Sequence, residues 1–391
     1  MDGYTLYARG PQDEFFVDYK NNIHQTDYKQ YTDFSMDTIE YQFGSSPFLG
    51  TKQTLSIPIK SIPGDLLTNI FLKFQLPSGY SYVSNVGRAI LNTVSLYLDS
   101  IEIETFDDDW YIIRDDIFLD DDEKKSIKRI VDTDGSMYIP LEFYFSRRNS
   151  KFRKEKKQWF PMCAAYKNTM YINIDFQKSE YLTGVEGVDI SNVKIVLETI
   201  TLTDIERSSL LSRPLSVKIQ KVYKEPVNTM TNGTVQMNIT ASFPVSLSVW
   251  FLRYSMYETN YLFYKQRYDY GYIKNDIFIY KNEEPFEYMN IYIDGKEITD
   301  NFSSTKFFTW LQPILSDLSS PSRSIYMYSF GISPTKGTFD FQKTDSNSCI
   351  INMKIKKDFE NELTSKYFIH MYHFGYTDLY FSNGMCSRLH I

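Results

Sequence analysis

The chain of 391 residues is longer than one ordinary domain core and predicts two domains. With 42 % hydrophobic and 17 % aromatic residues, it can fill two cores and favours β-sheet. The net charge of −7 argues against a nucleic-acid-binding protein, because such proteins normally carry a basic face. Cys163, Cys349 and Cys386 are too dispersed for a disulfide framework or a zinc site. Because we find neither a signal peptide nor an apolar stretch of membrane-spanning length, we expect a soluble, cytosolic, all-β protein.

The first half of the chain contains short runs of alternating apolar residues, and each run predicts a β-strand with one buried face. An aromatic and polar segment, residues 13–43, comes first and predicts an extended arm. Residues 106–131 place apolar side chains at roughly helical spacing among many charged ones, which predicts a short helix and loop inserted between strands. The predicted strands lie at residues 55–59, 70–76, 94–98, 101–103, 139–145, 170–176 and 193–202.

The strand pattern begins again after a predicted boundary at residues 208–212. Asp294-Gly295 predicts a tight hairpin. Phe339 and Phe341 predict a short strand between two longer ones. Two blocks of roughly eight short strands, spaced about 8–12 residues apart, predict two antiparallel sandwiches. The predicted strands of the second block lie at residues 215–219, 235–239, 245–251, 277–279, 289–293, 325–330, 351–355 and 368–381.

Several segments resemble the major capsid proteins of large eukaryotic DNA viruses. Tyr-Thr-Asp-Phe-Ser-Met-Asp-Thr-Ile-Glu at residues 31–40 is similar to the segment that enters the family's first jelly roll. Gly64-Asp65-Leu66, residues 86–90 and residues 138–145 resemble further family segments in the same order.

Residues 324–356 resemble the signature of this family. They combine Tyr-Ser-Phe, a loop that contains Pro and Gly, and an aromatic-x-Phe strand. Most members have Pro-Ser-Gly and Asn-Phe-Ser-Arg-Ile-Asp at its centre. Here Thr335-Lys336-Gly337 and residues 340–345 match that pattern more closely than they match its letters.

The resemblance implies a double jelly roll, that is, two consecutive eight-stranded antiparallel jelly rolls with short helical inserts. The implied domains are an N-terminal arm at residues 1–30, a first jelly roll at 31–211 and a second at 212–391. The implied function is that of a major capsid protein, a structural protein without enzymatic activity that forms trimeric, pseudo-hexagonal capsomers of an icosahedral virus. A three-subunit interface that closes on itself gives a discrete block instead of a fibre.

The implied partners are two further copies of the chain, neighbouring capsomers and minor capsid proteins, with no direct contact to nucleic acid. The resemblance leaves open an indirect association with an inner membrane. It places the protein in the virion shell, with assembly in the host cytoplasm. The alternatives are a double jelly-roll scaffold or minor capsid protein of such a virus, and a jelly-roll glycan-binding module, which would need an exposed aromatic platform beside a polar pocket.

We predict no catalytic, cofactor-binding or metal-binding residues. His370 and His373 invite a metal hypothesis, but residues three apart on a strand point to opposite faces and cannot chelate one ion without a kink. The carboxylates within residues 107–123 suit calcium in type but lack the EF-hand spacing, so the main interpretation is a solvated helix face.

A dense basic loop leaves three interpretations open: nucleic-acid binding, a solvated loop, or a contact with acidic surfaces of neighbouring subunits. Phe152 and Trp159 are its aromatic members. Its basic residues are Arg147, Arg148, Lys151, Arg153, Lys154, Lys156 and Lys157.

Overall fold

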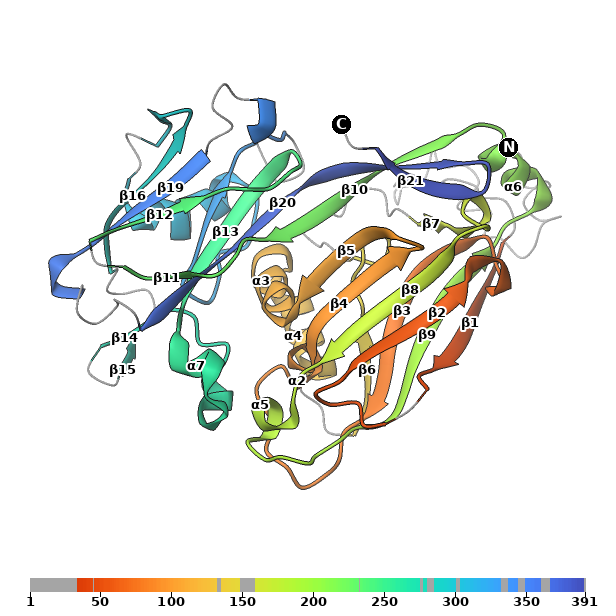
Figure 1. Ribbon diagram of the computed structural model, residues 1–391, viewed down its shortest axis with the longest axis horizontal. Coiled ribbons are helices and arrows are strands. Elements are labelled where there is room, and N and C mark those ends of the chain that lie inside the picture. Colours follow the sequence, from red (N-terminus) through yellow and green to blue (C-terminus); the bar gives the residue numbers. More distant parts are fainter. Residues whose placement is uncertain are drawn as a thin grey trace, which may run out of the picture.

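The computed structural model describes residues 34–44, 46–131, 135–147, 159–231, 233–274, 277–279, 285–299, 303–331, 337–343, 349–359 and 366–389. The predicted arm at residues 1–30 and most of the predicted basic loop lie outside these ranges. Of the segment 13–43 that the sequence predicts as an extended arm, residues 35–42 instead form a strand paired along its whole length with residues 194–201. The described part is mostly β-sheet, as the alternating apolar pattern predicts (Figure 1).

The first jelly roll consists of two antiparallel sheets that pack face to face. Sheet A has the strand order β1-β9-β3-β6, with the short β7 added to β3, and sheet B has the order β2-β8-β4-β5. The strands are β1 Ser35–Gln42, β2 Lys52–Pro58, β3 Leu66–Gln75, β4 Leu91–Leu98, β5 Ile101–Asp107, β6 Ser136–Pro140, β7 Phe160–Pro161, β8 Thr169–Phe176 and β9 Ser191–Thr201.

The second jelly roll repeats this arrangement. Sheet C has the order β10-β20-β13-β18, with β11 and β21 added to β20, and sheet D has the order β12-β19-β16-β17. The strands are β10 Leu215–Lys224, β11 Asn228–Thr229, β12 Thr234–Asn238, β13 Val245–Tyr254, β14 Tyr272–Lys274, β15 Ile277–Ile279, β16 Phe286–Ile293, β17 Lys296–Glu297, β18 Ile325–Ser329, β19 Cys349–Ile355, β20 Tyr367–Ser382 and β21 Met385–Leu389.

The two jelly rolls share one topology. If β7, β11, β14, β15 and β21 are set aside, each jelly roll has eight strands, and sheets A and C both combine the first, eighth, third and sixth of them. Sheets B and D likewise combine the second, seventh, fourth and fifth strands. The predicted double jelly roll is therefore confirmed. The predicted division between residues 211 and 212 lies between the end of α6 and the start of β10, and as a domain boundary it stays a proposal.

Short helices connect the strands. Each jelly roll has a helical insert between its fifth and sixth strands, α3 and α4 in the first and η6 and α8 in the second. The helices are α2 Val86–Ala89, α3 Asp108–Phe118, α4 Asp121–Val131, α5 Ser179–Thr183, α6 Asp204–Leu211, α7 Ser255–Thr259, α8 Gln312–Leu315, the π-helix η6 Phe307–Leu311, and the 3-10 turns η2 Ile59–Ser61, η4 Met162–Ala164, η5 Tyr261–Gln266, η7 Phe341–Lys343 and η8 Lys357–Phe359.

Sheet C has a hydrophobic core on each of its two faces. The face toward sheet D carries the core of the second sandwich, with residues such as Trp250 and Met371. On the opposite face, Val249 and Phe374 join a core that continues into the first jelly roll. Strand β20 runs along both jelly rolls (Figure 1), and the two sandwiches therefore pack as one block.

Several local predictions need correction. The predicted strand at 139–145 ends at Pro140, and the following residues turn away so that the Glu142 carboxylate reaches a buried arginine pair. Phe339 forms one isolated bridge to Val245, and Phe341 begins a 3-10 turn, so they do not form a strand.

Two further predictions concern strand faces and turns. In β18 the predicted alternation of faces is correct, but both faces are buried because each meets a different core. The hairpin at Asp294-Gly295 is confirmed. It joins β16 to β17 with φ angles of 50° and 75°, which suit the turn that this residue pair favours.

Candidate functional site

Helix α3 fills the space between the two jelly rolls. It follows β5 directly and lies against sheet C of the second jelly roll (Figure 1). The Trp110 and Phe374 rings have centroids 4.3 Å apart, and Phe118 packs on the same Phe374 ring at 5.4 Å. Aromatic pairs at such separations contribute beyond the area that they bury. This contact is the apolar centre of the interface between the jelly rolls.

Three consecutive aspartates at the start of α3 bind basic residues of the second jelly roll. Asp107 accepts a hydrogen bond from the Trp110 backbone N–H at 2.9 Å, which caps the helix, and pairs with Lys224 Nζ at 2.6 Å. Asp108 pairs with Arg267 Nη2 at 2.9 Å, and Asp109 pairs with Arg253.

Tyrosine hydroxyls donate hydrogen bonds to the same three carboxylates. The hydroxyls of Tyr372, Tyr268 and Tyr270 donate to Asp107, Asp108 and Asp109 at 2.8, 2.8 and 2.7 Å. Three carboxylates therefore face three cations and three hydroxyls in a buried layer between the jelly rolls. Buried charges are tolerated when they are paired and hydrogen-bonded in this way.

The two fully enclosed aspartates differ in their acidity. Burial acts to raise the pKa of both carboxyls, because it disfavours the charged form. For Asp108 this effect prevails over Arg267, and its pKa is raised. For Asp109 the nearby Arg253 and Lys224 charges prevail, and its pKa is lowered. Asp109 is the carboxylate whose charge the interface stabilises most clearly.

The solvated helix face predicted for residues 107–123 is wrong for its first part. Asp107, Asp108 and Asp109 are buried at the interface, whereas Asp121 and Asp122 in α4 are exposed, as predicted. The three buried carboxylates lie close enough together to hold a metal ion. Because each already pairs with a cation and a tyrosine hydroxyl, a calcium ion would have to displace these partners. The donor set therefore fits an internal ion-pair layer better than a calcium site.

Arg147, predicted as part of the basic loop, has its side chain largely buried at the same interface. Its guanidinium pairs with Glu104 Oε1 of β5 at 2.6 Å and donates to Gln220 Oε1 of β10 at 2.9 Å. Trp159 is exposed, and residues 148–158 lie outside the described ranges. Arg147 thus belongs to the structural interface, and the three interpretations of the remaining loop stay open.

The two histidines of β20 point to opposite faces, as predicted. His370 Nε2 lies 3.0 Å from Glu258 Oε2, and the ring stacks on Phe251 on the face toward the first jelly roll. His373 Nδ1 lies 2.7 Å from Ser248 Oγ. Burial lowers the pKa of both rings. The pair does not converge on one ion in this geometry.

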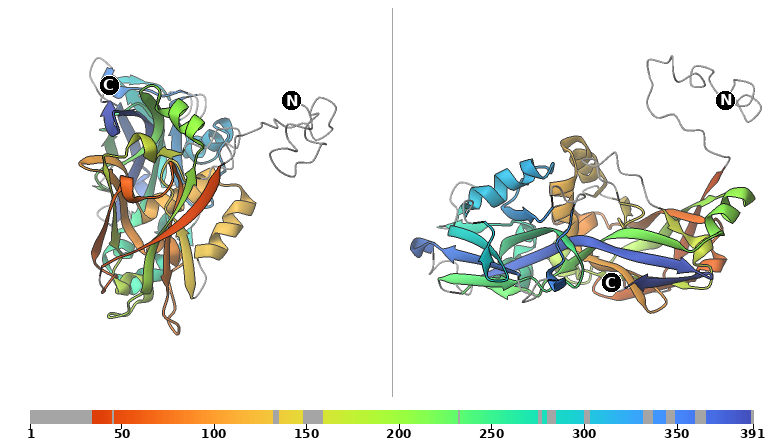
Figure 2. Two further views of the ribbon diagram at one scale, coloured as in Figure 1. Left: turned by 90° about the vertical axis from the view of Figure 1, so that its right-hand side faces the viewer. Right: turned by 90° about the horizontal axis from the view of Figure 1, so that it is seen from above.

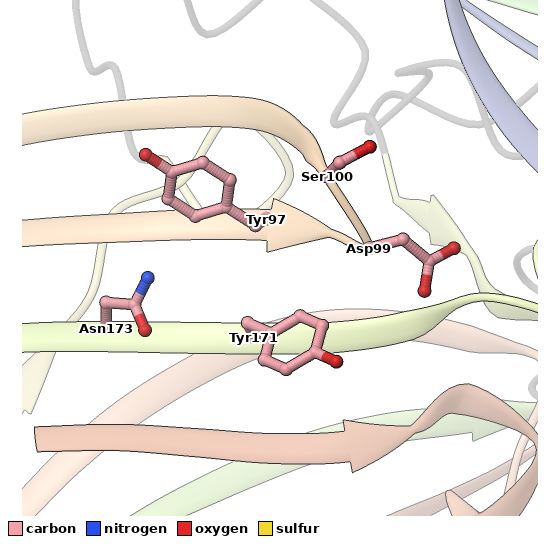
Figure 3. Close-up of a pocket in the computed structure, with 5 residues that line it drawn as sticks. All are labelled: Tyr97, Asp99, Ser100, Tyr171 and Asn173. Carbon is pink, nitrogen blue, oxygen red and sulfur yellow. The ribbon is translucent and has the colours of Figure 1, made fainter.

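A shallow depression on the outer face of sheet B bears on the alternative of a glycan-binding module, because it has two tyrosine rings beside polar side chains. Figure 3 shows Tyr97 and Tyr171 on neighbouring strands with Asn173, Asp99 and Ser100 near them. Both rings are half-buried, and the Asp99 carboxylate already accepts hydrogen bonds from Asn168 Nδ2 at 2.6 Å and the Thr169 N–H at 2.9 Å. The depression is open, and its carboxylate is engaged within the protein.

The helical insert of the second jelly roll carries an exposed apolar surface, here named the η6–α8 surface and defined by Trp310, Leu311, Ile314 and Leu315. Trp310 is 38 % exposed, Ile314 65 % and Leu315 59 %. Trp310, Leu311 and Ile314 border a groove of about 580 Å³ that Phe307 also lines. Phe308 of the same insert packs against Trp250 in the core, with ring centroids 5.6 Å apart. The insert is therefore anchored on one side and exposes apolar side chains on the other.

Sequence reasoning did not identify the buried ion-pair layer. One available signal was the composition of α3, where apolar residues follow the aspartates on nearly every face. A helix that is apolar all round is usually buried. Its cationic partners Arg253 and Arg267 are more than 140 residues away, and nothing in the local pattern connects them to the aspartates. Among the described residues, no helix has both the length and the apolar character needed to cross a membrane.

Comparisons with known proteins all point to one protein family. The model of the major capsid protein N-terminus matches residues 22–211, and the model of the large eukaryotic DNA virus major capsid protein matches residues 206–387. Capsid protein 1 of Acanthamoeba polyphaga mimivirus is 21 % identical over 277 residues, which are 59 % of this chain and 45 % of the relative. The major capsid protein of Paramecium bursaria Chlorella virus 1 is 27 % identical over 153 residues, or 36 % of this chain and 34 % of the relative. The chain thus spans about a third to a half of the length of these curated relatives.

Solved structures agree on the fold. A chain from a quasi-atomic model of the PBCV-1 virus capsid has a TM-score of 0.77 at 18 % identity, covering 94 % of this chain and 99 % of that chain. The Faustovirus major capsid protein has a TM-score of 0.68 at 10 % identity, covering 97 % and 96 %. Together the two family models span nearly the whole chain, each over one of its two jelly rolls. The chain belongs to the major capsid protein family of large eukaryotic DNA viruses.

Proposed function

We propose that this protein is a structural building block of an icosahedral virus shell, in which three copies form one pseudo-hexagonal capsomer. The observation that carries the proposal is the rigid union of two jelly rolls of equal topology in a chain of this family. Six similar sandwiches from three chains can surround one axis, and an interface that closes on itself yields a discrete block.

The interface between the jelly rolls suits this role. A capsomer keeps its shape only if the angle between its sandwiches is fixed. The α3 contact fixes that angle with packed rings at 4.3 Å and with ion pairs that are removed from water. Buried ion pairs stabilise little on net, but they oppose any arrangement that leaves one partner unpaired. The arrangement therefore supports a structural role, in which the two jelly rolls keep a fixed relative orientation, and not a catalytic one.

The proposal extends to partners and location. The capsomer would contact neighbouring capsomers and minor capsid proteins in the virion shell, after assembly in the host cytoplasm. All three described cysteines are free, with Cys349 and Cys386 buried, which suits assembly in a reducing compartment. We propose no enzymatic activity, because the related proteins are named as capsid proteins and the buried carboxylates are paired within the fold.

The absolute mass of the purified protein, measured by light scattering after size exclusion, tests this proposal. Three times 46.1 kDa, or about 138 kDa, is the expected mass. Electron microscopy of the same fraction should show hexagonal outlines. A stable 46.1 kDa monomer at micromolar concentration would refute the self-assembling capsomer and favour a minor capsid protein or a binding module.

A further inference from the structure

A histidine of the second jelly roll lies beside the buried ion-pair layer that joins the two jelly rolls. His370 belongs to β20, the long blue strand that extends along both jelly rolls in the right-hand view of Figure 2. The side chain is fully buried, and its ring stacks on Phe251 of β13 with ring centroids 5.0 Å apart. Its Nε2 atom lies 3.0 Å from Glu258 Oε2 of α7, whereas its Nδ1 atom has no hydrogen-bond partner within the described ranges. These surroundings fit a neutral imidazole, which has a single N–H donor.

Continuous contacts connect this histidine to the first jelly roll. The Glu258 carboxylate that contacts His370 also lies 3.6 Å from Arg253 Nη1, and Arg253 pairs with Asp109 at the start of α3. A second route runs through the rings, because Tyr270 stacks on the same phenylalanine with centroids 4.0 Å apart and its hydroxyl donates to Asp109 at 2.7 Å. The charge of His370 is thus coupled to the contact that fixes the two jelly rolls.

We propose that His370 is an acid-sensitive switch for the contact between the two jelly rolls. While its ring is neutral, α3 stays packed on sheet C, and when the ring takes up a proton the contact opens. Histidine suits this role because its charge ordinarily changes between neutral and mildly acidic pH. A shell built from such subunits would keep its shape in neutral cytoplasm and loosen in an acidic compartment. The inference goes beyond the proposed capsomer and does not depend on it, because every group involved belongs to one chain.

The geometry opposes a second positive charge at this place. A charged imidazole has two N–H donors, but the described residues offer no acceptor to Nδ1, and a buried donor without an acceptor costs free energy. Arg253 already lies over the Phe251 ring, with its guanidinium carbon 5.4 Å from the ring centroid, and is itself only 1 % exposed. Two cations would therefore share one aromatic ring and the Glu258 carboxylate.

The pKa of His370 agrees with this geometry. Burial lowers this pKa and prevails over the opposing effect of the hydrogen bond to Glu258. In an opened contact the ring would be hydrated and would titrate near its ordinary pKa of 6.5. As the pH falls, the open form therefore takes up the proton before the closed form does, and acid favours opening. The closed contact is fully favoured above pH 6.5 and weakens below it.

Other charged groups around the ring respond differently in this pH range. The titratable and charged groups that face the ring or the adjoining layer are Lys224 of β10, Arg253 of β13, Glu258 of α7, Arg267, Tyr268 and Tyr270 after η5, Tyr372 of β20, and Asp107, Asp108 and Asp109 at the start of α3. The pKa of Glu258 is lowered to about 2 and that of Asp109 is also lowered, so both stay charged near pH 6. The pKa of Asp108 is raised, so its protonation favours the closed form and opposes the switch.

Hydrogen exchange of α3 at two pH values tests the inference. The amides of Asp108–Phe118 report on opening of the contact, and those of β8, Thr169–Phe176 in sheet B of the same jelly roll, serve as the internal reference. After correction for the intrinsic pH dependence of exchange, we expect α3 to exchange faster at pH 5.5 than at pH 6.5. One proton changes the opening equilibrium by up to about tenfold per pH unit, while β8 stays protected. Equal protection of α3 at the two pH values would overturn the inference.

Two histidine variants distinguish this switch from a general effect of acid. His370→Gln keeps an N–H donor for Glu258 but takes up no proton near pH 6, so α3 exchange should lose its response to pH. His373→Gln is the matched control, because His373 lies on the same strand but contacts Ser248 on the opposite face. We expect this control to keep the wild-type response of α3. A wild-type response in His370→Gln, or its loss in the control, would overturn the inference.

A measurement on the wild-type protein keeps the test decisive even if His370→Gln does not fold. Slow exchange of the imidazole C2 hydrogen, followed by mass spectrometry across pH, gives the pKa of each histidine ring. We expect the pKa of His370 to lie below 6.5, and a value at or above 6.5 would overturn the inference. The mass of the purified protein at neutral pH tests the capsomer separately. A 46.1 kDa monomer would refute the capsomer and leave the switch standing.

Discussion

The insert of the first jelly roll and the insert of the second show how one topology can serve two purposes. Both begin after the fifth strand, and both anchor aromatic side chains in a core. Helix α3 is covered by sheet C of the same chain, whereas the residues that the structure describes leave the η6–α8 surface exposed. The chain therefore buries the apolar side chains of one insert and leaves those of the other partly exposed.

The two tryptophans provide the most direct way to sharpen this comparison. Trp110→Ala should lower the free energy of unfolding by about 3–5 kcal/mol, because it opens a cavity against Phe374. Trp310→Ala should lower it far less within the subunit, since that ring is partly exposed, but should raise the trimer dissociation constant. Urea unfolding at equal protein concentration and light scattering at dilution measure the two effects. Equal losses of subunit stability would break the comparison.

Asp109 tests the ion-pair layer. Asp109→Ala leaves Arg253 buried without its carboxylate, and we expect a loss of about 3–4 kcal/mol. Asp121→Ala is the matched control, because this carboxylate is exposed and its ion pair with Lys124 is long, at 3.9 Å. Chemical unfolding should detect no change in the control. A loss below about 1 kcal/mol for Asp109→Ala would mean that the layer is solvated.

Gly375 tests the point at which β20 passes from one jelly roll to the other. A Cβ atom there would lie 2.0 Å from the Pro244 carbonyl oxygen and 2.5 Å from the Phe243 ring. Gly375→Ala should therefore destabilise by about 1–3 kcal/mol. Gly44→Ala is the control, since nothing lies within 4 Å of its Cβ position. Thermal unfolding distinguishes the two, and an unaffected melting temperature for Gly375→Ala would refute the close approach.

The smallest expected effect depends on pH. Burial lowers the pKa of His373 below its ordinary 6.5 and prevails over the opposing effect of Glu225, whose Oε1 lies 3.1 Å from Nε2. As the pH falls, the unfolded chain therefore takes up this proton before the folded protein does. Stability from this group is complete above pH 6.5 and declines below it, by at most about 1.4 kcal/mol per pH unit. His373→Gln retains a polar partner for Ser248 and should flatten the wild-type slope between pH 6.5 and 5.5. Parallel slopes for the two proteins would assign the dependence to other groups.

Most strands could be predicted from the sequence because a half-buried strand has a period of two. β19 is an example, with Cys349, Ile351 and Met353 buried between half-buried neighbours. The prediction failed where a residue's role depends on a distant partner. Residues 141–147 leave the strand because Glu142 pairs with Arg88 and Arg114, and local alternation contains no trace of that pairing.

The candidate surfaces were harder to predict than the fold. A run of carboxylates favours a solvated surface, because an aspartate is rarely buried unless it is paired. Here the cationic partners come from the second jelly roll, so the local sequence does not show them. The η6–α8 surface gives no sequence signal, because an exposed apolar residue cannot be distinguished from a core residue by its type alone. Only the structure shows that Ile314 is exposed whereas helix α3 is covered.

A cryo-EM map of the purified trimer tests the central claim most directly. We predict that three copies surround one axis, so that their six jelly rolls give a pseudo-hexagonal outline. A trimer whose six jelly rolls do not surround one axis would contradict the account.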